Sequence, residues 1–310
     1  MKERKHIISL TDLKDNDLFD LVSRGVEFST GNTNYKNILN NHIIGIYFRK
    51  TSTRTRTAFS TAALRMGSQI ISYGPNDLQE NTGETIDDTT QVLSRMLDGL
   101  VARTAGSPQE MRTFASQKRM SVINAMSSEE HPTQALTDLT TMLKHFGTIS
   151  GLRVLYIGEG NNSAAALSLA LPRYKNTELY LYTPNGYGLS KSILEQAQNY
   201  ANKTGSRVIE SHNLNTLPSD IDVVYTTRWE TTGTTKPDLN WRNKFEGFTV
   251  NSEFMNIFPN AIFMHDLPAH RGDEVTAEII DGSSSIVFEQ SENKFYSALS
   301  VLEWCLNPSF

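Results

Sequence analysis

The chain has 310 residues, which corresponds to two domains of ~150 residues each. Its net charge is −5, from 29 basic and 34 acidic residues, which argues against a general nucleic-acid or membrane-surface binder. No apolar run reaches the ~18 residues of a membrane span, and the first residues, MKERKHIISL, lack the apolar core of a signal peptide, so we expect a cytoplasmic protein.

In the first half of the chain, apolar runs typical of buried strands alternate with helical patterns. We expect helices at 11–29, 57–66, 86–97, 107–117 and 131–146, and strands at 43–48, 69–73, 99–103 and 122–125. Thr11 is the expected cap of the first helix, and Ser107 with Pro108 begins the fourth. The polar loop 74–85 is long for a simple connector, which favours a functional role.

The pattern restarts after residues 147–151. We expect strands at 153–158, 178–182, 208–210, 223–226, 262–265 and 285–288, and helices at 163–171, 191–203, 251–258, 276–280 and 291–306. Such alternation predicts an α/β protein with two parallel-sheet domains and an interdomain cleft. The first domain comprises 1–147 and the last helix, 291–310, whose apolar face packs back on it, and the second comprises 148–290. The single cysteine, Cys305, excludes a disulfide framework and a cysteine-based metal site.

Hydroxyls and an arginine gather where the strand 43–48 gives way to a helix. Ser52, Thr53 and Thr55 with Arg54 lie beside the unpaired N–H groups of a helix N-terminus, which together would form a phosphate socket. The alternative is a plain N-terminal cap.

A second group of polar residues follows the next strands. Arg103 ends a strand, and His131 and Gln134 lie at the start of a helix. Because ligands bind at the carboxyl ends of parallel strands, we expect these residues to converge with the socket. The set suits a small phosphorylated compound with a polar carbonyl, whose oxygen would receive hydrogen bonds as negative charge develops on it.

The motifs FRKTSTRTR, DGLVART, HPTQALTDL and MHDLPAHRGDEVTAEIIDG resemble the aspartate/ornithine carbamoyltransferase family over nearly the whole chain. The resemblance implies a homotrimer with active sites between domains and at subunit interfaces, and no metal ion or organic cofactor. It implies that carbamoyl phosphate is bound by Ser52, Thr53, Arg54, Thr55, Arg103, His131, Gln134, Leu267 and Lys294. Lys294 stands where ornithine enzymes have arginine, and it lacks the bidentate fork.

The chemistry that the resemblance implies is attack of a neutral amine on the carbamoyl carbon. Arg103, His131 and Thr55 would stabilise the tetrahedral oxyanion, and phosphate would leave into the Ser52–Thr55 socket. The rate should rise with pH until the amine is neutral.

Three changes in the acceptor motifs depart from the ornithine enzymes. Asp266 replaces the cysteine of their His-Cys-Leu-Pro motif, and Thr227 replaces an aspartate that holds the acceptor's amino group. Thr231 and Thr232 replace Ser-Met before a glycine. We therefore hypothesise that the ammonium-binding carboxylate has moved from position 227 to Asp266.

Other residues suggest how the acceptor's carboxylate is held. Asn161 and Asn162 match paired asparagines that bind the α-carboxylate in ornithine enzymes, and Arg228 matches a carboxylate-binding arginine of aspartate enzymes. Together these features favour a diamino acid with a chain other than ornithine's, such as a shorter one. Ornithine itself and an aspartate-type acceptor are the alternatives.

The loop 74–85 corresponds to a family loop that reaches a neighbouring active site. A lysine of the aspartate enzymes is replaced there by Thr82, so Gln79 and Asn81 are expected to reach the neighbouring subunit instead. Glu84 is expected to pair with Arg56.

Two further functions belong to other classes. Gly158-Glu159-Gly160 is reminiscent of a dinucleotide fingerprint, but Ser163 occupies the place of its third glycine. A catalytically inactive binding or regulatory relative is the second, and the intact Ser-Thr-Arg-Thr and His-Pro-Thr-Gln motifs argue against it.

Overall fold

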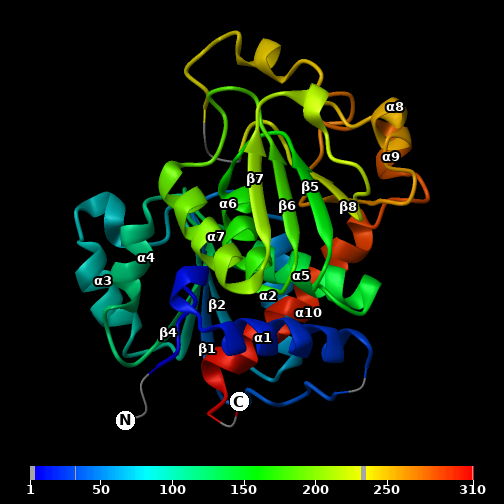
Figure 1. Ribbon diagram of the computed structural model, residues 1–310. Helices are drawn as coiled ribbons and strands as arrows, with labels where there is room; N and C mark the ends of the chain where they lie inside the picture. The colour runs from blue at the N-terminus through cyan, green and yellow to red at the C-terminus, as the bar shows by residue number, and fades with distance from the viewer. Residues whose placement is uncertain (1–3, 32, 232–234, 309) are drawn as a thin grey trace. The chain divides into compact units, whose positions relative to one another are not determined.

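The computed structural model describes residues 4–31, 33–231, 235–308 and 310, and the side chains of Glu80 and Asn81 lie outside this description. The chain forms two compact units, Met1–Thr140 with Asn293–Phe310, and Thr141–Glu292 (Figure 1). Each unit contains one parallel sheet with helices packed on it, so the predicted α/β class with two parallel-sheet domains is confirmed.

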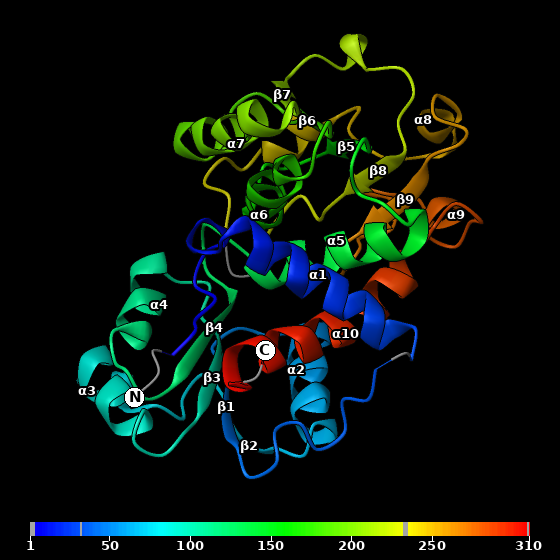
Figure 2. The same cartoon turned by 60° about the horizontal axis from the view of Figure 1, so that its bottom comes forward.

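The sheet of the first unit has four parallel strands in the order β2-β1-β3-β4. They are β1 (Ile43–Phe48), β2 (Gln69–Tyr73), β3 (Gly99–Arg103) and β4 (Ser121–Met126). Strands β1, β3 and β4 are buried almost throughout, as expected of a parallel sheet covered on both faces, whereas the edge strand β2 is largely exposed. Figure 2 shows α3 (Ile86–Leu93) and α4 (Pro108–Ala115) on one face, with α2 (Arg54–Arg65) on the other.

The sheet of the second unit has five parallel strands in the order β7-β6-β5-β8-β9. They are β5 (Arg153–Ile157), β6 (Glu178–Tyr182), β7 (Arg207–Ser211), β8 (Val223–Thr226) and β9 (Ile262–His265). Helices α6 (Asn162–Ala170) and α7 (Lys191–Thr204) pack on each other beside the sheet. An apolar cluster rich in phenylalanine joins the sheet to α8 (Ser252–Asn256) and α9 (Ala277–Ile280).

The remaining helices complete the two units. In the described part of the chain they are α1 (Asp15–Ser29), α5 (Pro132–Phe146), α10 (Val287–Leu306) and 3₁₀ helices at Leu10–Asp12, Gln79–Thr82, Leu171–Arg173, Leu214–Thr216 and Trp241–Phe245. The end of α10 packs on the first unit, as predicted: Ser300 Oγ donates to the Leu21 carbonyl at 2.7 Å, and Glu303 pairs with Arg24 at 2.7 Å. Among the described residues, no helix is long and apolar enough to cross a membrane.

Both sheets reverse their strand order beside their first strand. The chain passes from β1 to β2 on one side and then to β3 on the other, and it passes from β5 to β6 and later to β8 in the same way. Ligands of open α/β sheets bind at such switch points, beyond the carboxyl ends of the strands. The loops after β1 and β3, and those after β5 and β8, are therefore the places in each unit where a ligand site is expected.

Several predicted elements differ from the structure. The strand expected at 285–288 is wrong: Ser285 makes only an isolated bridge to Phe263, and α10 begins at Val287, four residues before its predicted start at 291. The helix expected from residue 11 to 29 is divided, because Ser9 caps a 3₁₀ turn at Leu10–Asp12 and α1 starts at Asp15. The helix expected at 86–97 ends at Leu93.

Candidate functional site

In the first unit, three loops with polar residues meet at the carboxyl end of the sheet. Phe48 pairs in register with Arg103, and Arg103 pairs in turn with Met126, so β1, β3 and β4 end side by side. The Arg49 amide also donates to the Arg103 carbonyl at 3.0 Å. This register brings the hydroxyl-rich turn after β1, the side chain of Arg103 and the segment leading to His131 to one edge, as the sequence predicts.

The turn after β1 leads into the N-terminus of α2. Thr53 occupies the cap position without a side-chain capping hydrogen bond, and the first turn holds no acidic residue. The alternative that these residues form a plain N-terminal cap therefore lacks the hydrogen bond from the Thr53 side chain that defines such a cap. Thr55 is buried, Ser52 and Arg54 are half-buried, and Thr53 is exposed. Hydroxyls beside a helix N-terminus without a competing carboxylate favour an anion.

His131 contacts both Arg103 and Thr133. Its Nε2 lies 3.4 Å from Arg103 Nη1, and its Nδ1 lies 3.3 Å from Thr133 Oγ1. Because a guanidinium can only donate, Nε2 accepts, which leaves the ring proton on Nδ1 facing Thr133. Burial lowers the pKa of His131 well below 6.5, and the positive charges of Arg103 and Lys294 lower it further. The imidazole is therefore neutral at neutral pH.

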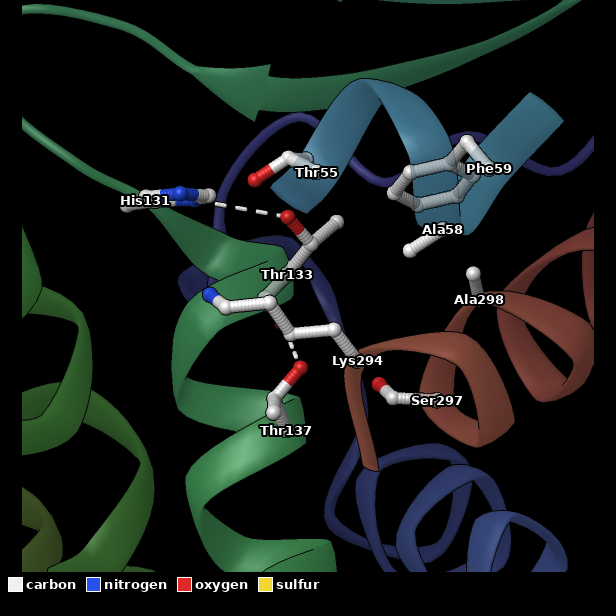
Figure 3. Close-up of a pocket in the computed structure, with 9 residues that line it drawn as sticks. All are labelled: Thr55, Ala58, Phe59, His131, Thr133, Thr137, Lys294, Ser297 and Ala298. Carbon is white, nitrogen blue, oxygen red and sulfur yellow. Dashed lines mark hydrogen bonds between the residues drawn. The ribbon is translucent and has the colours of Figure 1, made fainter. Parts of the chain in front are cut away.

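Gln134 is held from both ends of its amide. Lys294 Nζ donates to Gln134 Oε1, and Gln134 Nε2 donates to Asp138 Oδ1 at 2.8 Å. The amide orientation follows from these two partners, since ammonium groups donate and carboxylates accept. Figure 3 shows Lys294 reaching from α10 toward α5, beside a small pocket with about 220 Å³ of atom-free space that Thr55, His131 and Lys294 also line. Lys294 thus brings positive charge to the same place as Arg103.

In the second unit, the loop after β5 passes very close to its neighbours. A Cβ at Gly160 would lie 2.6 Å from the backbone carbon of Gly188, so only glycine fits there. The loop ends at Asn161, which caps α6: its Oδ1 accepts from the amides of Ser163 and Ala164 at 2.9 and 3.1 Å. The oxygen of Asn161 is thereby engaged, and its amide nitrogen is the part that can serve a carboxylate.

The loops after β5, β8 and β9 are joined by one hydrogen-bonded chain. Asn161 Nδ2 donates to Thr227 Oγ1 at 3.1 Å, and Thr227 Oγ1 donates to Asp266 Oδ1 at 3.0 Å. Ser163 Oγ donates to Asp266 Oδ2 at 2.8 Å. Positions 227 and 266 are therefore in contact, and a carboxylate at 266 lies beside the place that the sequence comparison assigned to an aspartate.

His265 supports the turn that carries Asp266 and Leu267. Its Nδ1 accepts the Leu267 amide at 2.7 Å, so Nε2 carries the proton and donates to Glu274 Oε1 at 3.1 Å. Leu267 has a φ of 51°, in the left-handed region that non-glycine residues rarely adopt. The backbone at Leu267 is thus held in place by a buried histidine.

Comparison with known proteins identifies the family. Residues 5–144 match the model of the aspartate/ornithine carbamoyltransferase carbamoyl-P binding domain, and residues 150–305 match that of the Asp/Orn binding domain. The chain belongs to the aspartate/ornithine carbamoyltransferase family. It is a carbamoyltransferase, an enzyme of the transferase class.

Its relatives include ornithine carbamoyltransferases from bacteria and archaea. That of Caldicellulosiruptor saccharolyticus is 35% identical over 96% of this chain and 97% of its own length, and that of Methanothermobacter thermautotrophicus is 36% identical over 97% and 99%. The solved ornithine carbamoyltransferase of Pyrococcus furiosus is 31% identical, with a TM-score of 0.92 over 99% of this chain and 98% of that one.

Among the site predictions for this carbamoyltransferase, one is wrong and two concern side chains outside the described part of the chain. The expected pair of Glu84 and Arg56 is wrong: Glu84 accepts from Thr89 Oγ1 at 2.7 Å, and Arg56 donates to Ser72 Oγ at 2.7 Å. Thr232 and the side chain of Asn81 lie outside the described residues. Gln79 is exposed, and its side-chain oxygen lies 3.1 Å from Thr82 Oγ1 within the same turn.

Arg228 and Thr231 lie in the segment after β8. The Arg228 side chain is 27% exposed, and its Nη2 lies 3.8 Å from Glu230 Oε2. Its Nε is buried without a hydrogen-bond partner among the described residues. Thr231 Oγ1 donates to Glu159 Oε2 at 3.2 Å.

Sequence reasoning missed the residues that position the motif side chains. Thr133 and Asp138 bind His131 and Gln134, and Ser163 binds Asp266. Asp138 follows Gln134 by four residues, a spacing that places both on one helix face and could have indicated the pair. Ser163 gave no such signal, because its partner is 103 residues away.

Proposed function

We propose that this carbamoyltransferase transfers the carbamoyl group of carbamoyl phosphate to an amine of a diamino acid, giving a ureido amino acid and phosphate. The first unit would bind carbamoyl phosphate. Its phosphate would be held by the turn from Ser52 to Thr55, where hydroxyls and Arg54 adjoin a helix N-terminus without an acidic residue. The other residues of the first unit that we assign to carbamoyl phosphate are Arg103, His131, Gln134 and Lys294. The family resemblance adds Leu267, which belongs to the second unit.

The proposed reaction begins with attack of a neutral amine on the carbamoyl carbon. As the carbonyl oxygen gains negative charge, it accepts hydrogen bonds from Arg103, from the Thr55 hydroxyl and from His131. In the structure the ring proton of His131 lies on Nδ1 and Nε2 accepts from Arg103, so the bond from His131 requires Arg103 to turn to the substrate and the ring proton to move to Nε2. The attacking nitrogen gives up a proton to a phosphate oxygen as the carbon–oxygen bond to phosphate breaks, and the phosphate remains in its socket with its negative charge matched by Arg54. A neutral His131 suits this role, because it adds a donor without an extra buried charge.

The observation that carries the proposed acceptor is the environment of Asp266. Each of its carboxylate oxygens accepts one hydroxyl, from Thr227 and from Ser163, which leaves lone pairs for a further donor. Among the described residues, no lysine or arginine forms an ion pair with it, and the His265 ring lies 3.5 Å away. That ring uses its near nitrogen to accept the Leu267 amide. An ammonium group of the acceptor fits this oriented and partly exposed carboxylate.

The acceptor's carboxylate requires donors, and the same edge of the second sheet supplies them. Asn161 keeps one N–H beyond the bond to Thr227, and among the described residues the guanidinium of Arg228 makes a single long ion pair, with Glu230 at 3.8 Å. Asn162 begins α6 beside them. We place the carboxylate of the acceptor among Asn161, Asn162 and Arg228, with Thr231 and Thr232 along its chain.

Two other acceptors compete with a diamino acid of altered length. Ornithine is favoured by the names of the relatives. An aspartate-type acceptor is favoured by Arg228, but it would bring a second carboxylate rather than an ammonium to Asp266. Phosphate release with 2,3-diaminopropionate, 2,4-diaminobutyrate, ornithine, lysine and aspartate separates these acceptors. We expect the highest kcat/KM with a diamino acid, and preference for aspartate would overturn the proposal.

Replacing Asp266 with asparagine is expected to raise the KM for the acceptor. A hydrogen bond to a charged group contributes about 1.5–3 kcal/mol, so the KM should rise roughly 10–100-fold. The KM for carbamoyl phosphate should stay the same. Steady-state kinetics with each substrate varied in turn measure both values.

The control is Asp281→Asn, which removes a carboxylate of the same unit that forms an exposed pair with Arg271 at 2.6 Å. It should leave both KM values unchanged. An unchanged acceptor KM in Asp266→Asn would show that the ammonium binds elsewhere.

We further propose a homotrimer in which the turn bearing Gln79 and Asn81 reaches a neighbouring subunit. The family resemblance and the exposure of Gln79 support this assembly. Multi-angle light scattering should give three times the chain mass of 34.7 kDa. A monomeric and active enzyme would refute the assembly without affecting the acceptor assignment.

A further inference from the structure

The His131 ring is held by two side chains of the first unit, one at each nitrogen. Arg103 Nη1 lies 3.4 Å from its Nε2, and Thr133 Oγ1 lies 3.3 Å from its Nδ1. Figure 3 shows the Thr133 hydroxyl directed at the ring from the start of α5, beside the pocket that both residues line. Among the described residues, no other side chain forms a hydrogen bond with the ring. Arg103 and Thr133 therefore fix its orientation together.

The Thr133 hydroxyl is available to His131 because α5 does not use it. Further along the helix, Thr140 Oγ1 donates to the Leu136 carbonyl at 2.7 Å, as threonine hydroxyls in helices often do. Thr133 lies in the first turn, and in the described part of the chain its Oγ1 bonds to His131 alone. The His131 carbonyl accepts the Gln134 amide at 2.9 Å, so one helical turn carries both the ring and the hydroxyl.

A neutral imidazole carries one proton, and its partners decide which nitrogen holds it. Burial lowers the pKa of His131, as do the charges of Arg103 and Lys294, so the ring is neutral at neutral pH. In the structure the guanidinium donates to Nε2, and Thr133 Oγ1 accepts the proton on Nδ1. In the proposed reaction Arg103 turns to the substrate and Nε2 donates to the carbonyl oxygen. Nδ1 then needs a donor where it previously needed an acceptor.

A hydroxyl group meets both needs, because it has one proton to donate and two lone pairs to accept with. Rotation about the Cβ–Oγ1 bond of Thr133 changes its role without moving a heavy atom. A carboxylate or a carbonyl only accepts, and a methyl group does neither. A hydrogen bond donated to Nδ1 also draws electron density from the ring, which makes Nε2–H a stronger donor to the developing oxyanion.

We propose that Thr133 is a positioning residue whose hydrogen bond with His131 reverses during the reaction. Its hydroxyl accepts from Nδ1 in the free enzyme and donates to Nδ1 when carbamoyl phosphate is bound. The ring loses the proton on Nδ1 to water and gains one from water on Nε2, so its charge is the same before and after. This inference rests on the proposed carbamoyl phosphate site of the first unit. Thr133 acts through His131 and need not touch the substrate.

The kinetic test compares Thr133→Val with Thr133→Ser in the full-length enzyme. Valine has nearly the shape of threonine but forms no hydrogen bond, whereas serine keeps the hydroxyl. We expect valine to lower kcat about tenfold, which corresponds to the loss of one hydrogen bond, and serine to keep kcat within about threefold of the native value. The acceptor KM should be unchanged in both. The matched control is Thr140→Val, which removes another buried hydroxyl of α5 and should leave kcat unchanged.

Nitrogen-15 NMR of the His131 ring gives a readout that a merely structural role of Thr133 would not move. The chemical shift of a ring nitrogen reports whether it carries a proton and, if not, whether it accepts a hydrogen bond. Loss of the signals in His131→Asn assigns them. The probe is the phosphonate analogue of carbamoyl phosphate, in which a methylene group replaces the bridging oxygen.

In the native enzyme we expect the ring proton on Nδ1 without the analogue and on Nε2 with it. In the complex with the analogue, the Nδ1 signal of Thr133→Val should lie where a nitrogen without a hydrogen bond resonates. Thr133→Ser should restore the native position, and Thr140→Val should not change it. This pattern would show that the hydroxyl donates to Nδ1 only when the donor site is occupied.

Three results would overturn the reversal. They are a ring proton on the same nitrogen with and without the bound analogue, an Nδ1 signal in the complex that valine leaves unmoved, and a valine variant that keeps more than about a third of the native kcat. A valine variant with a lower Tm and unmoved ring signals would show that Thr133 only stabilises the fold.

The same measurements separate this inference from the proposed function. An active native enzyme without a change of tautomer overturns the reversal and leaves the function standing. If the native enzyme carbamoylates no amino acid, the proposed function fails, and the ring signals with the bound analogue decide the reversal by themselves. Failure of the analogue to bind an inactive enzyme overturns both.

Discussion

Replacing Arg103 with glutamine is expected to lower kcat by about 10²–10³-fold, the usual cost of losing one donor to a developing oxyanion. Arg103 is buried at the end of β3, and its guanidinium directly contacts the His131 ring. A glutamine of shorter reach cannot place a charged N–H at the same point. Steady-state kinetics with saturating substrates measure the loss, and thermal unfolding checks that the variant is folded.

The same variant should also change the pH dependence of the enzyme. The positive charge of Arg103 helps to lower the pKa of His131, so its removal raises that pKa toward 6.5. A larger fraction of His131 would then be protonated at mildly acidic pH, and the acid limb of the kcat/KM profile should move to higher pH. Lys294 remains as a second positive charge, which limits the movement.

The control for both effects is Arg95→Gln. Arg95 is an exposed arginine of the same unit that donates to Gln91 in its own helical turn. It should leave kcat and the profile unchanged. If Arg103→Gln keeps more than about a tenth of the native kcat and an unshifted acid limb, Arg103 does not stabilise the transition state in the way proposed here.

The sequence predicts well that the polar loops of the first unit meet at one edge of its sheet, because strand order and motif position reinforce each other. Buried apolar strands and intervening helices require a parallel sheet, and a parallel sheet gathers whatever follows its strands at one edge. Arg103 and the turn after β1 therefore come together for a reason that needs no side-chain detail. In the structure, Phe48 at the end of β1 pairs with Arg103 at the end of β3, so the two strands end side by side.

The sequence predicts secondary structure less well where a short apolar run suits both a strand and the start of a helix. Residues 285–288 (SIVF) have the β-branched and aromatic character of a strand, yet they pass from an isolated bridge into a helix. The backbone pairs with Phe263 only at Ser285, and the apolar side chains serve a helix start instead. Short apolar runs cannot be assigned by composition alone, because both structures bury them.

The hydrogen bonds between side chains in the loops after β5, β8 and β9 could be predicted only in part from the sequence. The shift of a carboxylate from position 227 to 266 could be suspected from motif departures, but the contact of Thr227 with Asp266 depends on three loops meeting. Asn161 shows the same limit: its oxygen is used by the start of α6, which narrows its part in ligand binding to its N–H groups. Position identifies a candidate residue, and the hydrogen bonds show which of its atoms remain for a ligand.

Glu130, next to His131, leads to a prediction about stability. Glu130 is buried, and its Oε1 accepts the Leu10 amide at 2.7 Å. The chain around Leu10 is fastened beside β4, where the Ile7 amide donates to the Val122 carbonyl at 2.9 Å. Burial raises the pKa of Glu130 to about 7, and the hydrogen bonds from Leu10 and Ser9 limit this rise because they stabilise the charged carboxylate. The carboxyl group therefore ionises near neutral pH in the folded protein.

The folded protein holds a proton on Glu130 between pH 4.5 and about 7, where the unfolded chain has lost it. The resulting stability is fully present below pH 4.5 and is lost as the pH rises through about 7. A difference of ~2.5 pKa units corresponds to about 3 kcal/mol. Glu130→Gln, a neutral side chain of the same shape, should therefore match the native protein near pH 4.5 and exceed its stability by up to this amount above neutral pH.

His131 contributes a pH dependence of stability opposite to that of Glu130. Its lowered pKa means that the unfolded chain takes up a proton below pH 6.5 while the folded protein does not, so stability is lost as the pH falls. In the native protein the two neighbouring residues oppose each other across the same pH range. Glu130→Gln removes the contribution of Glu130 and leaves that of His131. The Tm of the variant should therefore rise with pH up to about 6.5 and then level off, while the native Tm changes less below pH 6.5.

The matched control is Glu129→Gln, since Glu129 is the adjacent carboxylate and is exposed. Calorimetry of all three proteins at several pH values measures the Tm, and the Glu129 variant should follow the native curve. A Glu130→Gln curve parallel to the native one would mean that Glu130 is ionised in the folded protein over the whole range. The turn that carries His131 would then already contain a buried negative charge, and the neutral state of His131 would have to be reconsidered with that charge included.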